Sequence, residues 1–96
     1  MTDQLPTITI TYCPGCNWMF RSSWMCQELL HSFGEHIHGV TLVPSKHTPG
    51  IFEIHIDEQL VWNRKTDGGF PSATDLKQRV RDIIDPDRDL GHHDKK

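Results

Sequence analysis

The chain has 96 residues, of which 35% are hydrophobic and 24% are charged, and its formal net charge is −3. A chain of this length has room for one small hydrophobic core, so we expect a single domain over residues 1–85 and a polar tail at residues 86–96. Basic residues are neither in excess nor clustered with aromatic residues, which excludes the usual composition of a nucleic-acid-binding protein.

The N-terminal residues lack the features of a targeting segment. They contain no basic stretch followed by an apolar run, so we expect no signal peptide, no membrane span and a cytoplasmic location. The cysteine content supports the same expectation. The chain has three cysteines, and an odd number would leave one thiol unpaired in a disulfide-stapled secreted scaffold.

A strand and then a helix are predicted at the start of the chain. In residues 7–12, isoleucine and tyrosine alternate with threonine, a period-two pattern typical of a strand. A helix is predicted at residues 17–33, because apolar residues recur there at helical spacing and Gly34 follows as a C-cap. Ser22 and Ser23 are small residues at which this helix could approach a sheet closely. The expected apolar face consists of Met19, Cys26, Leu29, Leu30 and Phe33.

Three further strands are predicted in the middle of the chain. A short apolar run within residues 37–44 fits a second strand, and a loop follows at residues 45–50. Residues 51–56 and 60–64 are predicted to pair as a hairpin, joined by the three polar residues 57–59.

A second helix is predicted after the polar, glycine-rich loop at residues 64–71. Ser72 and Asp75 resemble a capping box with aspartate in place of glutamate. Asp85-Pro86 ends the helix, and the polar tail that follows is expected to be partly disordered. The apolar face of this helix consists of Leu76, Val80, Ile83 and Ile84.

This order of elements predicts an α/β protein with a reduced thioredoxin-like fold. The order is strand, helix, strand, strand, strand, helix. A crossover helix makes the first two strands parallel, and the hairpin completes a four-stranded mixed sheet that two helices can cover. The helix that normally precedes the hairpin in this fold is missing, and the loop at residues 45–50 takes its place.

The clearest chemical signal is the motif Cys13-Pro14-Gly15-Cys16, at the junction of the first strand and the first helix. A helix N-terminus carries free amide donors and partial positive charge, both of which stabilise a thiolate. With two intervening residues, one thiol can attack a disulfide and the other can resolve the mixed disulfide. Pro14 and Gly15 shape the turn, and Pro14 lacks a backbone donor. The alternatives are half of a zinc site or two structural cysteines.

Four short segments occur in an order and spacing that resemble a known family. They are Tyr12-Cys13-Pro14-Gly15-Cys16, Gly50-Ile51-Phe52-Glu53-Ile54, Leu60-Val61-Trp62 and Lys65-Thr66-Asp67-Gly68-Gly69-Phe70. The chain resembles the selenoprotein W, T and H family, also called Rdx, over residues 7–84. Segments at residues 17–18, 27–30 and 85–92 resemble its bacterial branch. The resemblance implies a thioredoxin-like redox fold with a Cys-x-x-selenocysteine or Cys-x-x-Cys motif, in which Cys16 takes the selenocysteine position.

The resemblance leaves open which sulfur attacks. In thioredoxins the first cysteine of the motif is the nucleophile, which nominates Cys13. In the selenocysteine-containing members of the family the reactive atom is at the second position, which nominates Cys16. We expect Cys13 to attack, because without selenium the usual order of a dithiol centre applies.

Trp18, Pro49 and Phe70 are the expected neighbours of the dithiol. Trp18 could shield it or contact a protein substrate, and Phe70 follows two glycines whose loop could approach the site closely. Packing in the core or at its rim is the alternative for both rings. Pro49 is roughly where thioredoxins and glutaredoxins have a cis-proline, but we expect a trans bond, because cis forms are only about 5% of such bonds.

The remaining cysteine and the histidines are not expected to form a metal or cofactor site. Cys26 falls on the apolar face of the first helix and is predicted to be a buried small hydrophobe. There are seven histidines, including the pairs His36/His38 and His92/His93, but neither pair combines with the motif into a four-ligand zinc site. We expect solvated histidines.

Together these features predict a thiol-disulfide redox protein. Its expected partners are protein thiols or disulfides or glutathione, with glutathione or a thioredoxin system as reductant. The alternative is a redox-sensitive interaction module, in which Cys13 and Cys16 gate binding to another protein without turnover. A zinc-binding protein is a third reading.

Overall fold

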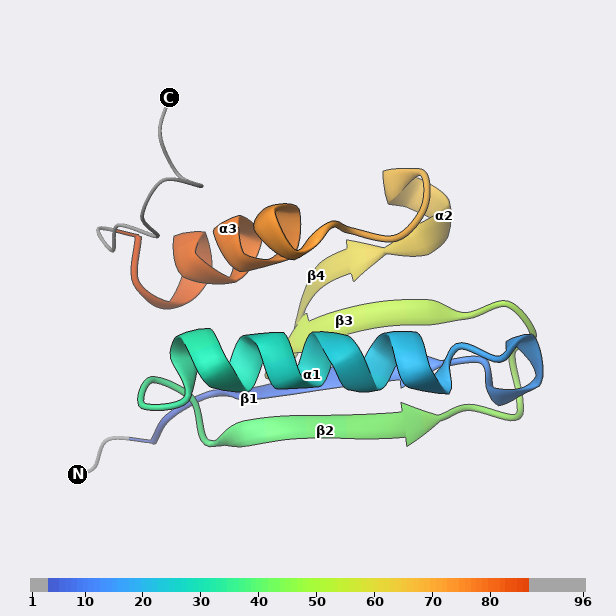
Figure 1. Ribbon diagram of the computed structural model, residues 1–96, viewed down its shortest axis with the longest axis horizontal. Helices are drawn as coiled ribbons and strands as arrows, with labels where there is room; N and C mark the ends of the chain where they lie inside the picture. Colours follow the sequence, from blue (N-terminus) through green and yellow to red (C-terminus); the bar gives the residue numbers. More distant parts are fainter. Residues whose placement is uncertain (1–3, 87–96) are drawn as a thin grey trace.

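The computed structural model describes residues 4–86, which form a four-stranded sheet with helices packed on one face (Figure 1). The strands are β1 (Thr7–Tyr12), β2 (Gly39–Pro44), β3 (Phe52–Ile56) and β4 (Gln59–Asn63). The helices are the 3-10 turn η1 (Pro14–Cys16), α1 (Met19–Phe33), the short α2 (Arg64–Asp67) and α3 (Ala73–Ile84). No helix in this part of the chain is long and apolar enough to cross a membrane.

The sheet has the mixed topology that the sequence predicts. The strand order is β2-β1-β3-β4, with β1 parallel to β2 and antiparallel to β3, and β3 antiparallel to β4. Burial alternates along β1: its isoleucines and tyrosine are buried, and its threonines are partly exposed. The isoleucines therefore mark the covered face of the sheet, and the β1 threonines face away from the helices.

The covered face of the sheet, α1 and α3 share one hydrophobic core. Leu29 and Phe33 come from α1, Leu76 and Val80 come from α3, and all four are at most 1% exposed. The core also contains Ile8, Ile10, Tyr12, Met25, Ile37, Phe52, Ile54, Ile56, Val61 and Trp62. Burial of apolar surface from the sheet and from both helices holds the helices against the sheet.

The buried face of α1 differs from the predicted one. Met19 and Leu30 are 43% and 44% exposed, whereas Ser22 is fully buried together with Met25. The prediction selected the face by apolarity, but the small side chain of Ser22 faces the sheet and allows the close approach expected of it. Gly34 is the C-cap with right-handed helical angles, and a Cβ there would lie 2.6 Å from the carbonyl oxygen of Leu30.

The hairpin is tighter and less regular than predicted. Its loop has two residues rather than three, because Gln59 already pairs with Ile56, and Asp57 takes the left-handed conformation at φ 53°. Further along, Ile54 pairs with Trp62 and His55 pairs with Leu60, which leaves Val61 as an extra residue in β4. This bulge interrupts the alternation of the strand, so that Val61 and Trp62 are both buried.

Two short-range features decide the structure between β4 and the end of α3. The predicted loop at residues 64–71 contains the one-turn helix α2, whose N-cap Asn63 accepts a hydrogen bond from the amide of Lys65. The predicted N-cap of α3 is confirmed, since Ser72 Oγ accepts from the amide of Asp75 at 3.0 Å. Asp85 ends this helix. The tail predicted at residues 86–96 lies, except for Pro86, outside the described residues.

Candidate redox site

The two cysteines lie just beyond the C-terminal end of β1, at the right-hand end of the molecule in Figure 1. Cys13 directly follows the strand, and Pro14–Cys16 forms a 3-10 turn. Asn17 then takes the left-handed conformation at φ 62°, and Trp18 is the N-cap of α1. The expectation that the motif leads directly into a helix starting at Asn17 is therefore wrong, because a left-handed residue separates the 3-10 turn from α1.

The two sulfur atoms form a direct hydrogen bond. The Cys16 thiol donates to Cys13 Sγ at a sulfur-to-sulfur distance of 2.8 Å, and both cysteines are free thiols. Cys13 is only 6% exposed, whereas Cys16 is partly exposed. The chain thus brings together the two residues that the sequence singled out, in their reduced form.

Hydrogen bonds make the two thiols unequal. The pKa of Cys13 is lowered, first by the hydrogen bond from the Cys16 thiol and then by the backbone amide of Gly50, with smaller help from the amides of Cys16 and Gly15. The pKa of Cys16 is raised, mainly because its thiol must keep its proton to donate a hydrogen bond to Cys13. Burial also disfavours the charged form of Cys16. The geometry therefore favours a Cys13 thiolate that accepts a hydrogen bond from a protonated Cys16.

The loop before β3 supplies the amide that reaches the sulfurs. Gly50 has φ 78°, a conformation that favours glycine, and its amide hydrogen bond lowers the pKa of both Cys13 and Cys16. Pro49, the predicted neighbour, is exposed and lies one residue earlier. Its peptide bond is trans, as expected, since there are no cis bonds among residues 4–86.

Trp18 and Phe70 meet, although they are far apart in the sequence. Their ring centroids are 5.0 Å apart in an edge-to-face arrangement, and Phe70 makes a similar contact with Phe52 at 4.8 Å. Trp62 Nε1 donates to the carbonyl of Gly69 at 2.8 Å, which holds the glycine loop beside Phe70. The two predicted neighbours thus pack against the core and connect the residues after the motif to β3.

Two arginines at this end of the molecule were not predicted. The guanidinium carbon of Arg64 lies 5.0 Å from the centre of the Trp18 ring, and that of Arg21 lies 4.3 Å from the centre of the Phe70 ring. Arg64 also donates to the carbonyl of Gly50 at 3.2 Å, and its positive charge acts to lower the pKa of Cys16. From the sequence, Arg64 was predicted to lie in a polar loop. The one signal that could have singled it out is that it directly precedes residues 65–70, one of the four segments that resemble the family.

Cys26 and the described histidines take no part in this arrangement. Cys26 is only partly buried on α1 and is not part of the hydrophobic core, so the prediction of a buried small hydrophobe is met only in part; burial raises the pKa of its thiol. Within residues 4–86 there is no cluster of three or more histidine, cysteine, aspartate or glutamate side chains arranged to hold a metal ion. His92 and His93 lie outside the described residues.

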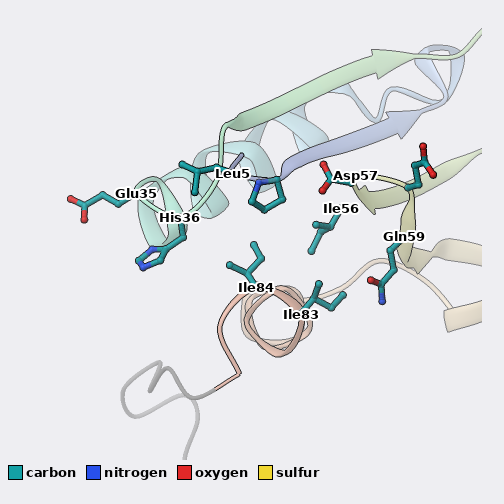
Figure 2. Close-up of a pocket in the computed structure, with 10 residues that line it drawn as sticks. Leu5, Glu35, His36, Ile56, Asp57, Gln59, Ile83 and Ile84 are labelled. Atoms are coloured by element: carbon teal, nitrogen blue, oxygen red, sulfur yellow. The ribbon is translucent and has the colours of Figure 1, made fainter. Parts of the chain in front are cut away.

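One pocket lies at the other end of β1 from the dithiol. It has a volume of about 580 Å³ and lies between the hairpin, the residues that precede β1 and the C-terminal end of α3 (Figure 2). Beside Gly50, by contrast, there is a cavity of only about 80 Å³. Small-molecule sites usually measure about 300–1,000 Å³, so the cavity beside Gly50 is itself too small to enclose a ligand.

Comparison with known proteins identifies similar sequences and structures. A family model described as the Rdx family matches residues 7–82. The structure of a selenoprotein W-related protein from Vibrio cholerae is 54% identical and superposes with a TM-score of 0.80, covering 85% of this chain and all of that one (100%). A protein from Bordetella parapertussis is 51% identical with a TM-score of 0.78, covering 82% of this chain and 98% of that chain.

More distant relatives come from mammals. The proteins called migration and invasion enhancer 1 from Mus musculus and Bos taurus are each 32% identical over 74 residues, which is 77% of this chain. The match spans 61% of the length of these curated relatives. The family model spans most of the globular part, and the bacterial structures share its thioredoxin-like fold. The chain therefore belongs to the Rdx family, the family of selenoprotein W, as the segments around the dithiol motif indicated.

Proposed function

We propose that this protein is a thiol-disulfide oxidoreductase whose redox centre is the Cys13–Cys16 dithiol. The observation that carries the proposal is the 2.8 Å hydrogen bond between the two sulfurs, together with the lowered pKa of one thiol and the raised pKa of the other. A disulfide needs sulfurs about 2.05 Å apart, so oxidation requires them to approach by less than about 1 Å. Membership of a family related to selenoprotein W supports the same chemistry.

In the proposed cycle Cys13 attacks and Cys16 resolves. The Cys13 thiolate attacks one sulfur of a substrate disulfide, a new sulfur-sulfur bond forms, and the other substrate sulfur leaves as a thiolate that takes up a proton. Cys16 then loses its proton and attacks Cys13 Sγ, which releases the second substrate thiol. The substrate has gained two electrons and two protons, and the protein holds a Cys13–Cys16 disulfide. A thiol reductant returns the electrons and protons by the same exchange chemistry.

The choice of Cys13 as nucleophile depends on thiolate character. Only a thiolate attacks a disulfide, and the hydrogen bonds in this site favour ionisation of Cys13. Exposure favours the other residue, since Cys13 is 6% exposed and Cys16 is more open. Thiolate character carries more weight, because protonated Cys16 donates to Cys13 and is a poor nucleophile in that state.

A protein disulfide suits the surface around the motif better than a small enclosed ligand. The cavity beside Gly50 is small, and the first turn of α1 presents Phe20 and Met19 to solvent, Phe20 at 79% exposure. An exposed aromatic side chain next to a redox centre can contact a protein substrate. Glutathione or a thioredoxin system is the class of reductant that can regenerate the dithiol.

The proposal is tested by a disulfide-reduction assay with glutathione as reductant. The wild-type protein and Cys26→Ser should turn over at similar rates, because Cys26 lies outside the site. Cys13→Ser and Cys16→Ser should each lose turnover. If wild-type protein captures a partner only in one redox state but reduces no disulfide catalytically, the protein is a redox-sensitive interaction module, and the proposed function is wrong.

A further inference from the structure

We propose that Arg64 is a positioning residue for the dithiol, which holds the Gly50 loop through its carbonyl and keeps a positive charge at the Trp18 ring, two residues after Cys16. Arg64 begins α2, a segment that sequence analysis treated as a loop, and its guanidinium reaches back to the residues around the motif. The inference deepens the proposed redox function and rests on it for its importance. Its contacts and its test do not depend on turnover.

The backbone around Arg64 is held by hydrogen bonds at both ends of α2. Asn63 Oδ1 accepts from the amides of Lys65 and Thr66 at the start of the helix. The carbonyl of Arg64 accepts from the amides of Gly68 and Gly69 at its end. Few backbone conformations satisfy all these bonds, so the position of the Arg64 backbone, from which its side chain extends, is well defined.

The side chain connects this helix to the loop that faces the sulfurs. Arg64 Nη2 donates to the carbonyl of Gly50 at 3.2 Å. The same residue, Gly50, directs its amide toward Cys13 and Cys16. Because the bonded carbonyl restricts the backbone of Gly50, Arg64 helps to keep the thiolate-stabilising amide in place.

The position of the Arg64 guanidinium is energetically unfavourable in one respect. Arg64 Nε is buried and has no hydrogen-bond partner in the part of the chain that the structure describes. A buried donor without a partner is unfavourable, because it has lost its hydrogen bonds to water. The contact of the guanidinium with the Trp18 ring, at 5.0 Å, offsets part of this cost. A cation held at this place is consistent with a role at the dithiol.

The positive charge of Arg64 favours the step in which Cys16 resolves the mixed disulfide. Cys16 must lose its proton before it can resolve the mixed disulfide, and the Arg64 charge lowers the pKa of that thiol against the effects that raise it. The other arginines at this end have different contacts. Arg21 lies over Phe70, and Arg79 pairs with Asp67 at 3.2 Å and lies over Trp62. Lys65, the neighbour of Arg64, is exposed.

The test compares Arg64→Gln with Lys65→Gln, which removes the same charge one residue away. Thiol alkylation by iodoacetamide is followed as a function of pH, and the reduction potential is measured by equilibration with glutathione buffers. We expect Arg64→Gln to raise the pKa of the Cys13 and Cys16 thiols and to slow their alkylation at pH 7 by roughly threefold to tenfold. This is the loss of thiolate that corresponds to a rise in pKa of about half a unit to one unit. Its potential should become more negative, because the reduced, thiolate-containing form loses stabilisation.

Two further variants complete the test. Arg64→Lys keeps the charge and should recover most of the alkylation rate, whereas Lys65→Gln should match the wild type. If Arg64→Gln does not fold, Arg64→Met is a second neutral variant with a long unbranched side chain and should give the same shifts. A folded neutral variant with wild-type thiol pKa and potential would overturn the inference. Both quantities are measured without substrate turnover, so a failure of the proposed oxidoreductase activity would be seen separately.

Discussion

At the scale of single residues, the two thiols differ because of the groups that surround them. Cys13 accepts hydrogen bonds from the Cys16 thiol and from backbone amides, whereas Cys16 donates and sits beside the charge that Cys13 acquires. None of these groups belongs to the first turn of α1. The 3-10 turn and Gly50 supply the donors that the helix N-terminus was expected to supply.

The hydrogen bond from Cys16 contributes most to the lowered pKa of Cys13, so its removal should change the titration of Cys13. In Cys16→Ala we expect the pKa of Cys13 to rise toward its ordinary value. In the wild type the thiolate should persist at lower pH, because a lowered pKa means that the proton is lost earlier as pH rises. Thiolate absorbance at 240 nm, followed against pH, measures both. An unchanged titration in Cys16→Ala would contradict the assigned donor.

The roles of the two sulfurs can be separated by trapping. Cys16→Ser leaves the attacking thiol without its resolving partner, so incubation with a disulfide substrate should accumulate a mixed disulfide at Cys13. Cys13→Ser should accumulate less, because burial still disfavours the Cys16 thiolate after the interaction with Cys13 is lost. Mass spectrometry of the trapped protein identifies the residue. Trapping only through Cys16 would show that the second cysteine attacks.

Ser22 makes a residue-scale prediction about stability. Its side chain is fully buried, and Oγ has no hydrogen-bond partner within residues 4–86. Ser22→Ala should therefore leave the free energy of unfolding unchanged or raise it by about 1 kcal/mol, because the desolvated hydroxyl is removed. Ser23→Ala, at a partly exposed neighbouring position, is the control. Urea unfolding compares them, and a loss above about 1 kcal/mol in Ser22→Ala would reveal a partner for the hydroxyl.

At the scale of elements, short-range caps and one bulge give this end of the molecule its form. α2 is a single turn that begins at an asparagine cap and ends at Gly68, which has φ 82°. The bulge in β4 places Val61 and Trp62 in the interior together, and Trp62 then holds the Gly69 carbonyl. Through these contacts, α2 and the glycine loop bring Arg64 and Phe70 to the motif.

The cap of α2 can be tested directly. Asn63→Ala removes the acceptor for the Lys65 and Thr66 amides and should cost about 1 kcal/mol of unfolding free energy. It should also slow thiol alkylation, because Arg64 loses its defined starting position. Thr66→Ala, at an exposed position in the same helix, should change neither quantity appreciably. A stable Asn63→Ala protein with wild-type alkylation would show that the site does not depend on the cap.

At the scale of the whole molecule, both longer helices share one face of the sheet and one core. The dithiol lies beyond one end of β1, and the pocket lined by Ile56 and Ile84 lies at the opposite end (Figure 2). The candidate redox site is formed by segments from different parts of the chain. It is an edge of the fold where β1, the loop before β3 and α2 meet.

The shared core predicts the effect of truncating α1. Leu29 is fully buried, and Leu29→Ala should lower the free energy of unfolding by about 2–5 kcal/mol through lost burial and the cavity left behind. Leu30→Ala is the matched control, because Leu30 is 44% exposed on the same helix. Chemical denaturation measures both variants. Equal losses would mean that the assigned face of α1 is wrong.

The sequence alone determined the order of the strands and the two longer helices, the mixed sheet and the pair of cysteines that the structure brings together. These features follow from local patterns: alternation in β1, helical spacing in α1 and α3, and two thiols separated by two residues. The resemblance in four short segments also led to the correct family.

Only the tertiary structure decided which groups act on the sulfurs. Gly50 and Arg64 are distant from the motif in sequence, and their contacts exist only because β3 pairs with β1 and α2 follows β4. The buried face of α1 was decided in the same way. Ser22 is fully buried although its side chain is polar, because the packing of the helix and not the polarity of the residue decides which side is covered. Hydrogen bonds and packing between distant segments leave no periodic signal in a sequence, so the environment of the dithiol could not be predicted from it.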